Sequence, residues 1–418
     1  MLKTPKSLRL QIGLFGRTNV GKSTFLNYIT NQDVSITSPI PGTTTDVVEK
    51  AIELLPIGPV LFLDTAGLDD RSELSGARLK KTDNIFKRAD IYVLVTEAGI
   101  WDEYEKKITG SAKKENTPLI IVINKSDIKK PDQGFIDRLK VYTQNVILSS
   151  SADKRLQDFT IHEFKRNLIE IVPSDFLNPP PIIGDLMPSG GLAILIVPID
   201  LEAPKGRIIL PQVQTIRDAL DGNQMTLTVK ESEYTQALKK LKNPPDLVVC
   251  DSQVVHRMVS ETPADIKCTT FSILFARIKG NLEEAVRSVS VIDKLQSGDK
   301  ILIAESCSHH PIEDDIGRVK IPKWIKGYTK KEIVFDSCAG RDFSDSLSQY
   351  KLIIQCGGCM ISRREMLSRI EQAKAQGVAM TNYGVCISYL SGVLSRVLSP
   401  LTVLEHTCRQ AGVLKNRS

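Results

Sequence analysis

The sequence predicts an α/β fold, a doubly wound and mostly parallel sheet followed by two smaller α/β domains. Short apolar runs alternate with helical segments along nearly the whole chain, which is typical of parallel sheets. A proline- and glycine-rich stretch at 173–191 interrupts the alternation. The length of 418 residues also exceeds what one hydrophobic core usually serves. We therefore expect three domains, at 1–174, 175–268 and 269–418.

The composition narrows the classes of function. Hydrophobic residues make up 41% of the chain and the formal net charge is only +6, without the dense basic stripe that nucleic-acid binding favours. No apolar run approaches the roughly 18 residues of a membrane span, and the N-terminus lacks the apolar core of a signal peptide. We therefore expect a cytoplasmic protein with no nucleic-acid partner and no membrane partner.

The eight cysteines are confined to the second part of the chain, from Cys250 onward. An extracellular disulfide framework is expected in a small secreted chain, not in one half of a large one. The asymmetry therefore predicts thiol-free chemistry in the N-terminal half and metal binding in the C-terminal half.

A phosphate-binding loop lies between the first apolar run and the first helical segment. The loop reads GRTNVGKS and matches G-x-x-x-x-G-K-S/T in the strand–loop–helix context that this pattern requires. Gly16 and Gly21 let the backbone turn its N–H groups toward phosphate, and Lys22 would reach the β- and γ-phosphates. The hydroxyl of Ser23 would bind Mg²⁺, and Thr24 beside it is a further nucleotide-binding candidate.

Three further segments, each at the end of an apolar run, indicate that the base is guanine. LFLDTAG places Asp64 in the Mg²⁺ shell and the Gly67 amide at the γ-phosphate. NKSD ends in Asp127, whose carboxylate can accept hydrogen bonds from both N1–H and N2–H₂ of guanine, whereas adenine offers no matching pair. The segment SSSAD then supplies a backbone amide for guanine O6. The other residues of this base-binding region are Asn124, Lys125, Ser151 and Ala152.

The residues expected to support hydrolysis lie in two loops. PGTTTD stands where such domains carry a mobile loop that closes on Mg²⁺ and the γ-phosphate, and Thr44 is the first choice among its three threonines. Leu68 follows Gly67, where Ras-like proteins carry the glutamine that orients the attacking water. We therefore expect slow hydrolysis, with Lys22, Thr44 and Asp70 as catalytic candidates. Asp70 fits the role of an exposed loop carboxylate equally well.

These motifs resemble the Era and MnmE branch of GTPases. The resemblance rests on GRTNVGKS, PGTTTD, DTAGLDD and NKSD. In potassium-activated members of that branch, an asparagine at the position of Asn19 helps to bind K⁺ beside the phosphates. The resemblance therefore implies GTP, Mg²⁺ and K⁺ as ligands and a GTPase that K⁺ stimulates.

The segment after the proline-rich stretch carries regular structure but no motif chemistry. LAILIVPI at 192–199, MTLTVK at 225–230 and DLVVCD at 246–251 are typical of strands, and EYTQALKKLK is typical of a helix. Cys250 closes one strand and is interpreted as a packed thiol. We expect a structural or dimerising role for 175–268.

The last segment repeats the alternation and places cysteines directly after its strands. KILIAE, EIVFD, KLIIQ and VAMTNYGV are typical of strands. Helices are expected over 281–295, 362–377 and 386–398. If the strands are parallel, Cys307, Cys356 and Cys359 converge at the carboxyl edge of the sheet, where ligands bind. Three thiolates suit an iron–sulfur cluster or zinc, and the spacing does not choose between them. Buried thiols and dithiol chemistry are the alternatives.

The pairing of this GTPase branch with C-x-H and a distant C-x-x-C resembles the HydF family, the GTPases of FeFe-hydrogenase maturation, across essentially the whole chain. The family motif is C-x-H followed by H-C-x-x-C, and Cys307, His309, Cys356 and Cys359 match it. Gln355 departs from it, because most members carry histidine there. The resemblance implies a 4Fe–4S cluster on the three cysteines, with His309 as a fourth ligand or as a hydrogen-bonded neighbour of the cluster.

The resemblance also implies a cargo and partners. It implies a homodimer whose three domains bind GTP, dimerise and bind the iron–sulfur cluster, and which assembles or carries a transient diiron subcluster precursor. The precursor would be delivered to the FeFe-hydrogenase apoprotein, with radical-SAM hydrogenase maturases acting upstream. Cys338 is a rival for the fourth cluster position, although the family motif does not include it. The alternative functions are a tRNA-modification GTPase of the MnmE type and a GTP-controlled thiol oxidoreductase with a reversible Cys356–Cys359 disulfide.

Overall fold

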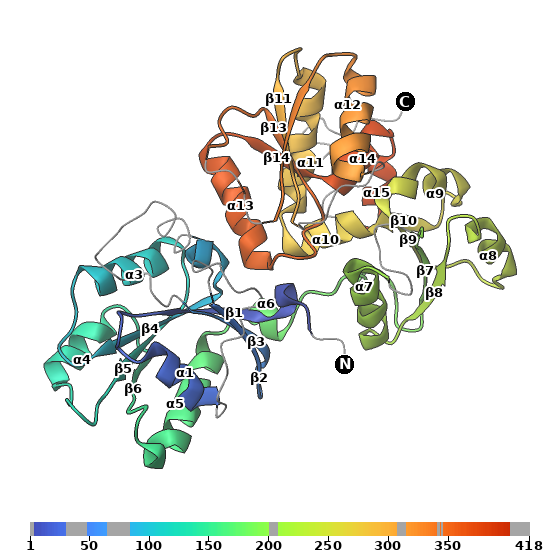
Figure 1. Cartoon of the computed structure of the whole chain (residues 1–418). Helices are drawn as coiled ribbons and strands as arrows, with labels where there is room; N and C mark the ends of the chain where they lie inside the picture. Colours follow the sequence, from blue (N-terminus) through green and yellow to red (C-terminus); the bar gives the residue numbers. More distant parts are fainter. Residues whose placement is uncertain are drawn as a thin grey trace. The chain divides into compact units, whose positions relative to one another are not determined.

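The computed structural model divides into two units, Met1–Pro179 and Pro180–Ser418 (Figure 1). The residues that the structure describes are 4–30, 48–64, 84–199, 208–306, 315–340, 343 and 346–401. Within these residues, no helix combines the length and the apolar character needed to cross a membrane.

The first unit is a six-stranded sheet in the order β2-β3-β1-β4-β5-β6. All neighbouring strands are parallel except β2 and β3, which are antiparallel. Its strands are β1 (Leu10–Phe15), β2 (Val48–Leu54), β3 (Gly58–Asp64), β4 (Ile91–Glu97), β5 (Leu119–Asn124) and β6 (Val146–Leu148). Its helices are η1 (Lys6–Leu8), α1 (Lys22–Thr30), α3 (Glu103–Lys114), α4 (Gln133–Lys140), η2 (Lys154–Leu156), α5 (Gln157–Ile171) and α6 (Ser174–Leu177).

The two faces of this sheet are covered by different helices, which explains why its central strands are largely apolar. Alternate residues of β1 and β4 pack against α1 and α5 on one face. The residues between them pack against α3 and α4 on the other face. Strands buried on both faces read as nearly continuous apolar runs, as β5 does before Asn124, and in β1 Gln11 is the polar exception. The predicted doubly wound, mostly parallel sheet is confirmed.

The second unit begins with a four-stranded parallel sheet in the order β10-β9-β7-β8. Its strands are β7 (Leu192–Ile196), β8 (Met225–Val229), β9 (Leu247–Cys250) and β10 (Lys267–Thr270). Its helices are α7 (Leu210–Asp221), α8 (Tyr234–Lys240), η3 (Ser252–Val254), α9 (Val255–Glu261) and α10 (Phe271–Lys279). The three predicted strands and the predicted helix are present, and β10 is an additional strand.

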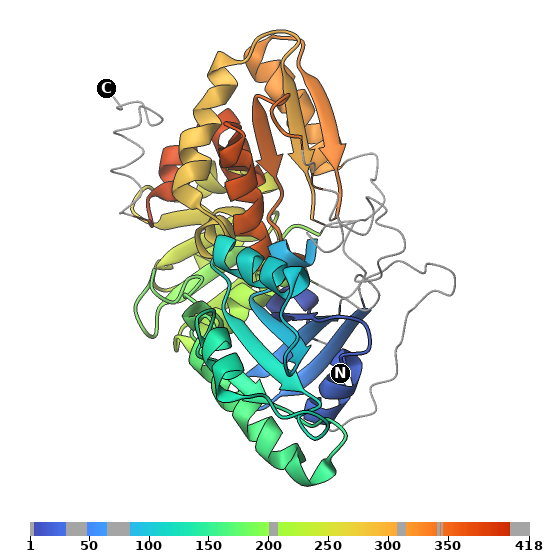
Figure 2. The same ribbon diagram turned by 90° about the vertical axis from the view of Figure 1, so that its left-hand side faces the viewer.

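A second four-stranded parallel sheet follows in the order β12-β11-β13-β14. Its strands are β11 (Lys300–Ala304), β12 (Val334–Cys338), β13 (Leu352–Gln355) and β14 (Ala379–Asn382). Its helical elements are α11 (Leu282–Val289), η4 (Ser290–Lys294), the π-helical turn η5 (Ile316–Lys320), α12 (Ile321–Thr329), α13 (Arg363–Ala375), α14 (Tyr383–Leu390) and α15 (Leu394–Leu398). The parallel arrangement expected here is confirmed, and Figure 2 gives a second view of the sheets.

The helix predicted over 386–398 is in fact two helices. Gly392, with φ of 69°, separates α14 from α15, and this left-handed conformation favours glycine. The N–H of Val393 then donates to the carbonyl of Ser388 across the break. The apolar pattern that both helices share concealed this interruption.

The helices of the C-terminal sheet lie on two faces. Helix α13 covers one face, while α11, α12 and α14 lie on the other (Figure 1). The face with α14 shares its core with the preceding sheet, because Ile194 and Val248 belong to the same apolar cluster as Ile303 and Ile354. The two sheets of the second unit are therefore joined by one continuous hydrophobic core.

Candidate functional site

The phosphate-binding loop connects β1 to α1 and takes the backbone shape that its glycines permit. Gly16 has φ of 147°, Asn19 of 64° and Gly21 of 91°. Gly16 is tightly surrounded, since a Cβ atom there would lie 2.4 Å from the carbonyl oxygen of Val95. Lys22 is buried, and its Nζ donates to the carbonyls of Gly16 and Arg17. The lysine amine is thus held inside the loop that would enclose the phosphates.

The Mg²⁺ candidates from two elements face each other. The Ser23 hydroxyl at the start of α1 lies 3.4 Å from Oδ2 of Asp64, which ends β3 and is 4% exposed. Oxygen donors of this kind are the ones Mg²⁺ prefers. The catalytic candidates Thr44 and Asp70, together with Gly67, lie outside the described residues.

The NKSD segment follows β5 and connects the phosphate loop to the base region. Asn124 is 2% exposed, donates from Nδ2 to the carbonyl of Val20, and accepts at Oδ1 from the Ser151 hydroxyl at 2.8 Å. Lys125 donates to the carbonyl of Asn19 at 2.7 Å. These contacts indicate that Asn124 and Lys125 hold the two loops together.

Asp127 is exposed and is oriented by a buried hydroxyl. The Ser150 Oγ donates to Oδ1 of Asp127 at 2.7 Å, while Ser150 itself is 1% exposed. A carboxylate fixed at one oxygen and open to solvent at the other is suited to a purine edge with two donors. Ala152, predicted to donate its amide to O6, lies two residues after Ser150 in the chain.

Sequence reasoning missed a contact between the phosphate loop and α3. The Arg17 guanidinium donates to both carboxylate oxygens of Glu105, at 2.7 and 2.8 Å, and the Tyr104 hydroxyl accepts from the Gly16 N–H at 3.2 Å. Burial alone would raise the pKa of Glu105, but the Arg17 and backbone hydrogen bonds outweigh it and the pKa lies below its usual value. Arg17 occupies a position of the motif at which any residue is allowed. Only the acidic segment DEYE at 102–105 could therefore have suggested a partner for its guanidinium.

The second predicted site lies at the carboxyl edge of the C-terminal sheet. Ala304 at the end of β11 is paired with Gln355 of β13 on one side and with Cys338 of β12 on the other. Cys356 continues β13, and its N–H donates to the carbonyl of Ala304 at 2.9 Å. The structure therefore places Cys356 beside the end of β11, which lies three residues before the predicted ligand Cys307 in the chain.

Three hydrogen-bonding groups surround the Cys356 sulfur. The Ser306 N–H donates to Sγ at 3.1 Å, the Ser306 Oγ lies 3.4 Å from it, and the Gln355 Nε2 lies 3.5 Å from it. Gln355 is 1% exposed. The Ser306 contacts could not be assigned from the sequence, because Ser306 is brought to Gln355 and Cys356 only by the pairing of β11 with β13.

A buried cation lies behind the C-x-x-C loop. Lys279, at the end of α10, is 6% exposed, and its Nζ donates to the carbonyls of Gly358 and Ile361 at 3.3 and 3.2 Å. Burial lowers the pKa of Lys279 to about 8, against the opposing effect of Cys359 and Cys356. Burial raises the pKa of the Cys359 thiol, and Lys279 partly offsets this rise.

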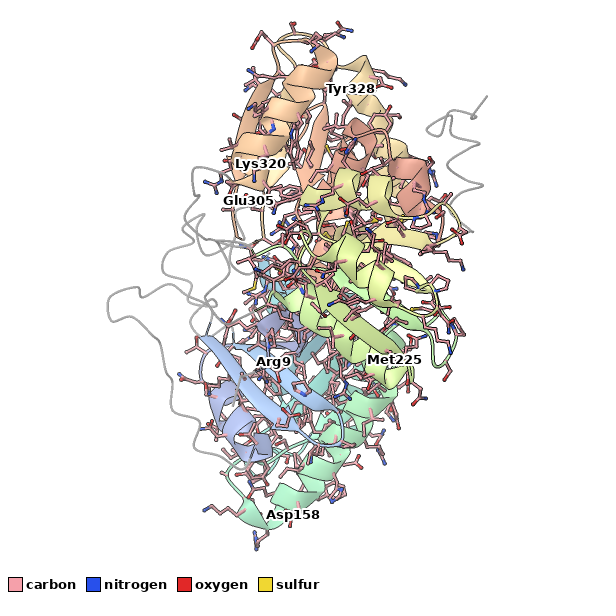
Figure 3. All side chains as sticks on the ribbon, turned by 90° about the vertical axis from the view of Figure 1, so that its right-hand side faces the viewer. Arg9, Asp158, Met225, Glu305, Lys320 and Tyr328 are labelled. Carbon is pink, nitrogen blue, oxygen red and sulfur yellow. The ribbon has the colours of Figure 1, made fainter. Side chains whose placement is uncertain are left out.

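An ion pair between a buried glutamate and a partly exposed arginine holds the chain on the far side of this edge. Glu305, directly after β11, is 4% exposed and accepts at Oε2 from Nε and Nη2 of Arg318 at 3.0 and 2.8 Å. Figure 3 labels Glu305 and also Lys320, the last residue of η5. Gly317 is needed here, because a Cβ atom would lie 2.0 Å from the Tyr383 hydroxyl. The pair thus fixes both ends of the chain that leaves β11 and returns in η5.

An apolar pocket opens beside Cys356. It is a small, partly open cavity of about 30 Å³ between α10, α11 and α13 and the ends of β13 and β14. Its lining includes Phe275, Met366, Ile370, Met380, Gln355 and Cys356. One side of the Cys356 residue is therefore bounded by apolar side chains.

The predicted cluster ligands are described only in part. Cys356 and Cys359 lie in the structure, while Cys307 and His309 lie outside the described residues. Among the residues that are described, no three or more His, Cys, Asp or Glu side chains form a group that could hold a metal ion. The two described thiols fit the soft donors that iron and zinc accept, at the sheet edge where ligands bind.

Three family models match successive parts of the chain. The model described as the 50S ribosome-binding GTPase matches 11–125. The hydrogen maturase F dimerization domain matches 182–280, and the hydrogen maturase F tetramerization domain matches 283–400. The first domain is thus of the GTPase family, and the descriptions of the other two indicate oligomerisation.

Curated relatives resemble the chain in its GTPase part. The tRNA modification GTPase MnmE of Synechococcus sp. (strain JA-3-3Ab) is 40% identical over 128 residues, which cover 30% of this chain and 27% of the relative. GTPase Der of Campylobacter lari is 32% identical over 180 residues, which cover 41% of this chain and 38% of the relative. The chain thus spans well under half the length of these relatives.

Solved structures resemble the same part. Era of Aquifex aeolicus bound to GDP and AlF₄⁻ is 26% identical, with a TM-score of 0.32 and coverage of 39% of this chain and 57% of that one. The G domain of the T. maritima FeoB iron transporter is 19% identical, with a TM-score of 0.30 and coverage of 40% and 99%. TM-scores of this size support no functional argument.

Proposed function

Because the chain belongs to the hydrogen maturase F family, we propose that it is a GTP-hydrolysing scaffold that carries a 4Fe–4S cluster on Cys307, Cys356 and Cys359. On this cluster it assembles or carries the diiron subcluster and delivers it to the FeFe-hydrogenase apoprotein. Radical-SAM hydrogenase maturases supply the precursor. The family assignment supports a role for this GTPase in hydrogenase maturation. The scaffold role is our proposal.

The observation that carries the cluster site is the contact between the ends of β11 and β13. Ser306 donates its N–H to the sulfur of Cys356 at 3.1 Å, and Ser306 directly precedes Cys307 in the chain. A hydrogen bond from a backbone N–H to sulfur stabilises a metal-bound thiolate. The likeness to MnmE is confined to the GTPase part and so does not carry the tRNA-modification alternative.

In the nucleotide site, the protein's groups position the phosphates and the base. Lys22 would exchange its hydrogen bonds to the loop carbonyls for hydrogen bonds to the β- and γ-phosphates, whose negative charge increases in the transition state. Ser23 and Asp64 would hold Mg²⁺, Thr44 would close over it, and Asp70 is the candidate to orient water. GTP binding or hydrolysis would change partner association or cluster accessibility.

The cluster ligands are tested by Cys307→Ser. Anaerobically reconstituted wild-type protein is expected to bind about four irons per chain and to give a 4Fe–4S EPR signal on reduction, as three thiolate ligands would hold such a cluster. Cys307→Ser should lose most of the iron and the signal. Cys250→Ala, which removes a buried thiol of the preceding sheet, is the matched control and should keep both. A full-strength signal in Cys307→Ser would refute the ligand assignment.

The fourth position and the delivery step need separate measurements. Cys338→Ser should leave the iron content unchanged if this thiol is not a ligand, and should change the EPR line shape if it is. For delivery, loaded protein is mixed with FeFe-hydrogenase apoprotein and hydrogen evolution is measured. Wild-type protein that carries the diiron precursor should activate the apoprotein, whereas protein with the 4Fe–4S cluster alone should not. Activation by both forms would contradict the carrier role.

Potassium is expected to accelerate GTP hydrolysis. Asn19 lies in the phosphate loop at φ of 64°, and its side chain is the candidate K⁺ ligand beside the phosphates. Hydrolysis should be slow in Na⁺ and several-fold faster in K⁺. Asn19→Gly should abolish this difference without straining the loop, because glycine adopts the same φ readily. Asn116→Gly, at φ of 48° after α3, is the matched control. Equal wild-type rates in the two salts would remove the cation site from the proposal.

A further inference from the structure

We infer that Gln355 is a positioning residue for Cys356. Gln355 donates a hydrogen bond to the Cys356 sulfur and does not itself bind iron. This inference rests on the proposed cluster site and assigns a role to the residue that departs from the family motif. It depends on which end of the Gln355 amide faces the sulfur, and the neighbouring residues determine that orientation.

Arg369 fixes the amide. Its Nη1 donates to Oε1 of Gln355 at 3.2 Å. A guanidinium carries only donors, so the amide atom that faces it must be the oxygen and the NH₂ group must point the opposite way. That NH₂ group lies 3.0 Å from the Ser306 hydroxyl and 3.5 Å from the Cys356 sulfur. Burial of Gln355 leaves no solvent to support the reversed orientation.

Arg369 is itself held firmly on α13. Its Nη2 donates to the carbonyl of Gly340 at 2.7 Å and to Glu365 at 3.3 Å, and the guanidinium lies over the ring of Phe343 at 5.1 Å. The side chain is only 5% exposed. The arginine therefore connects the ends of β12 and β13 and gives the Gln355 amide one stable position.

Three donors would consequently converge on a metal-bound sulfur. The Ser306 N–H and the Gln355 NH₂ group are two of them. The Ser306 hydroxyl accepts from the Cys356 thiol at 3.4 Å in this structure and would become the third donor on a metal-bound thiolate. Such a thiolate carries no proton, so the hydroxyl can turn its own hydrogen toward sulfur while it accepts from Gln355. Hydrogen bonds to cluster sulfurs stabilise the more negative, reduced state and raise the reduction potential.

The same geometry argues against Gln355 as an iron ligand. An amide binds iron through its oxygen, and Oε1 of Gln355 faces the cationic guanidinium of Arg369. A metal cation bound to this oxygen would be repelled by the guanidinium. If Arg369 moved away from the oxygen instead, its buried positive charge would lose one of its hydrogen-bond partners. The position that most family members fill with histidine is used here to support the neighbouring cysteine.

Two variants distinguish the effect of losing the hydrogen-bond donor from the effect of changing the shape of the side chain. Gln355→Met keeps the length but removes every hydrogen bond, while Gln355→Glu keeps the acceptor for Arg369 and replaces the donor near sulfur by an oxygen. Gln349→Glu is the matched control, because it adds the same charge on an exposed residue near Lys300, at the opposite edge of the same sheet. Thermal unfolding of each reconstituted full chain checks that the variants are folded.

The measurement is an EPR-monitored titration of the one-electron reduction of the cluster by dithionite, together with iron content. Both Gln355 variants should keep the wild-type iron content. At the wild-type midpoint potential, the ratio of reduced to oxidised cluster should fall about threefold in Gln355→Met, as expected for one weak hydrogen bond. In Gln355→Glu it should fall about tenfold, which corresponds to about 59 mV for one electron. Gln349→Glu should match the wild type.

Each other outcome is informative. Loss of iron, or a new EPR line shape, in folded Gln355→Met would mean that Gln355 is a ligand and would overturn the inference. Wild-type potentials in both Gln355 variants would also overturn it and leave the cluster site intact. A wild-type chain that takes up no iron would overturn the proposed function, and the inference with it.

Discussion

Replacement of Asp127 by asparagine is expected to lower the affinity for GTP by about a hundredfold or more and to create a preference for xanthine nucleotides. The carboxylate would accept two hydrogen bonds from guanine, and bonds to a charged group contribute roughly 1.5–3 kcal/mol each. An asparagine amide keeps one acceptor and gains a donor, which matches O2 of xanthine. Equilibrium binding of fluorescent GTP and XTP analogues measures both effects.

Ser150→Ala is the comparison for this variant. It removes the hydroxyl that donates to Asp127 Oδ1 at 2.7 Å but leaves the carboxylate in place. GTP affinity should fall only about tenfold, because one orienting hydrogen bond is lost, and the preference for guanine should persist. Unaltered GTP binding by Asp127→Asn would contradict the guanine contact.

Gly16→Ala should lower the affinity for GTP by at least about a hundredfold. The new Cβ would lie 2.4 Å from the Val95 carbonyl oxygen, and Gly16 has φ of 147°, which a residue with a side chain rarely adopts. Because the clashing atom belongs to the backbone of β4, the loop must shift and lose its amide donors. Isothermal titration with GTP and Mg²⁺ measures the loss.

Gly110→Ala provides the matched control for Gly16→Ala. Gly110 is exposed within α3, and beyond the adjoining residues and the backbone of its own helix no described atom lies within 4 Å of a Cβ built there. Alanine in a helix interior is favoured over glycine by about 1 kcal/mol, so thermal stability should rise slightly while GTP affinity stays unchanged. If Gly16→Ala bound GTP as tightly as Gly110→Ala, the assignment of this loop to the phosphates would be wrong.

The fold could be predicted to the extent that its strands are apolar and end in recognisable turns. β7 and β9 are continuous apolar runs, and β11 and β13 each carry only one polar residue, at an end, because both faces of each parallel strand are covered. The sequence therefore identifies all four. β10 was missed. It reads KCTT, and its one apolar residue is the buried Cys268. Its pairing with β9, not its own composition, makes it a strand.

The candidate sites could be predicted where residues from one loop act together. The residues of GRTNVGKS and NKSD are brought together by the fold, and the C-x-x-C pair lies at the predicted edge. The environment of Cys356 could not be predicted, because Ser306 and Arg369 are distant in sequence and meet Gln355 only through strand pairing and the packing of α13. Lys279 is similarly remote from Gly358, to which it donates.

The core shared by the two sheets of the second unit limits how that unit can respond to its partners. Ile196 and Cys250 of the first sheet and Ile301 and Leu352 of the second are buried in the same cluster, so neither sheet can rotate without exposing the other's apolar residues to water. A rotation between chains at a contact on the β7–β10 sheet would therefore turn the cysteine-bearing edge through the same angle. The oligomer would then control which direction the thiols face, while their mutual spacing stays constant.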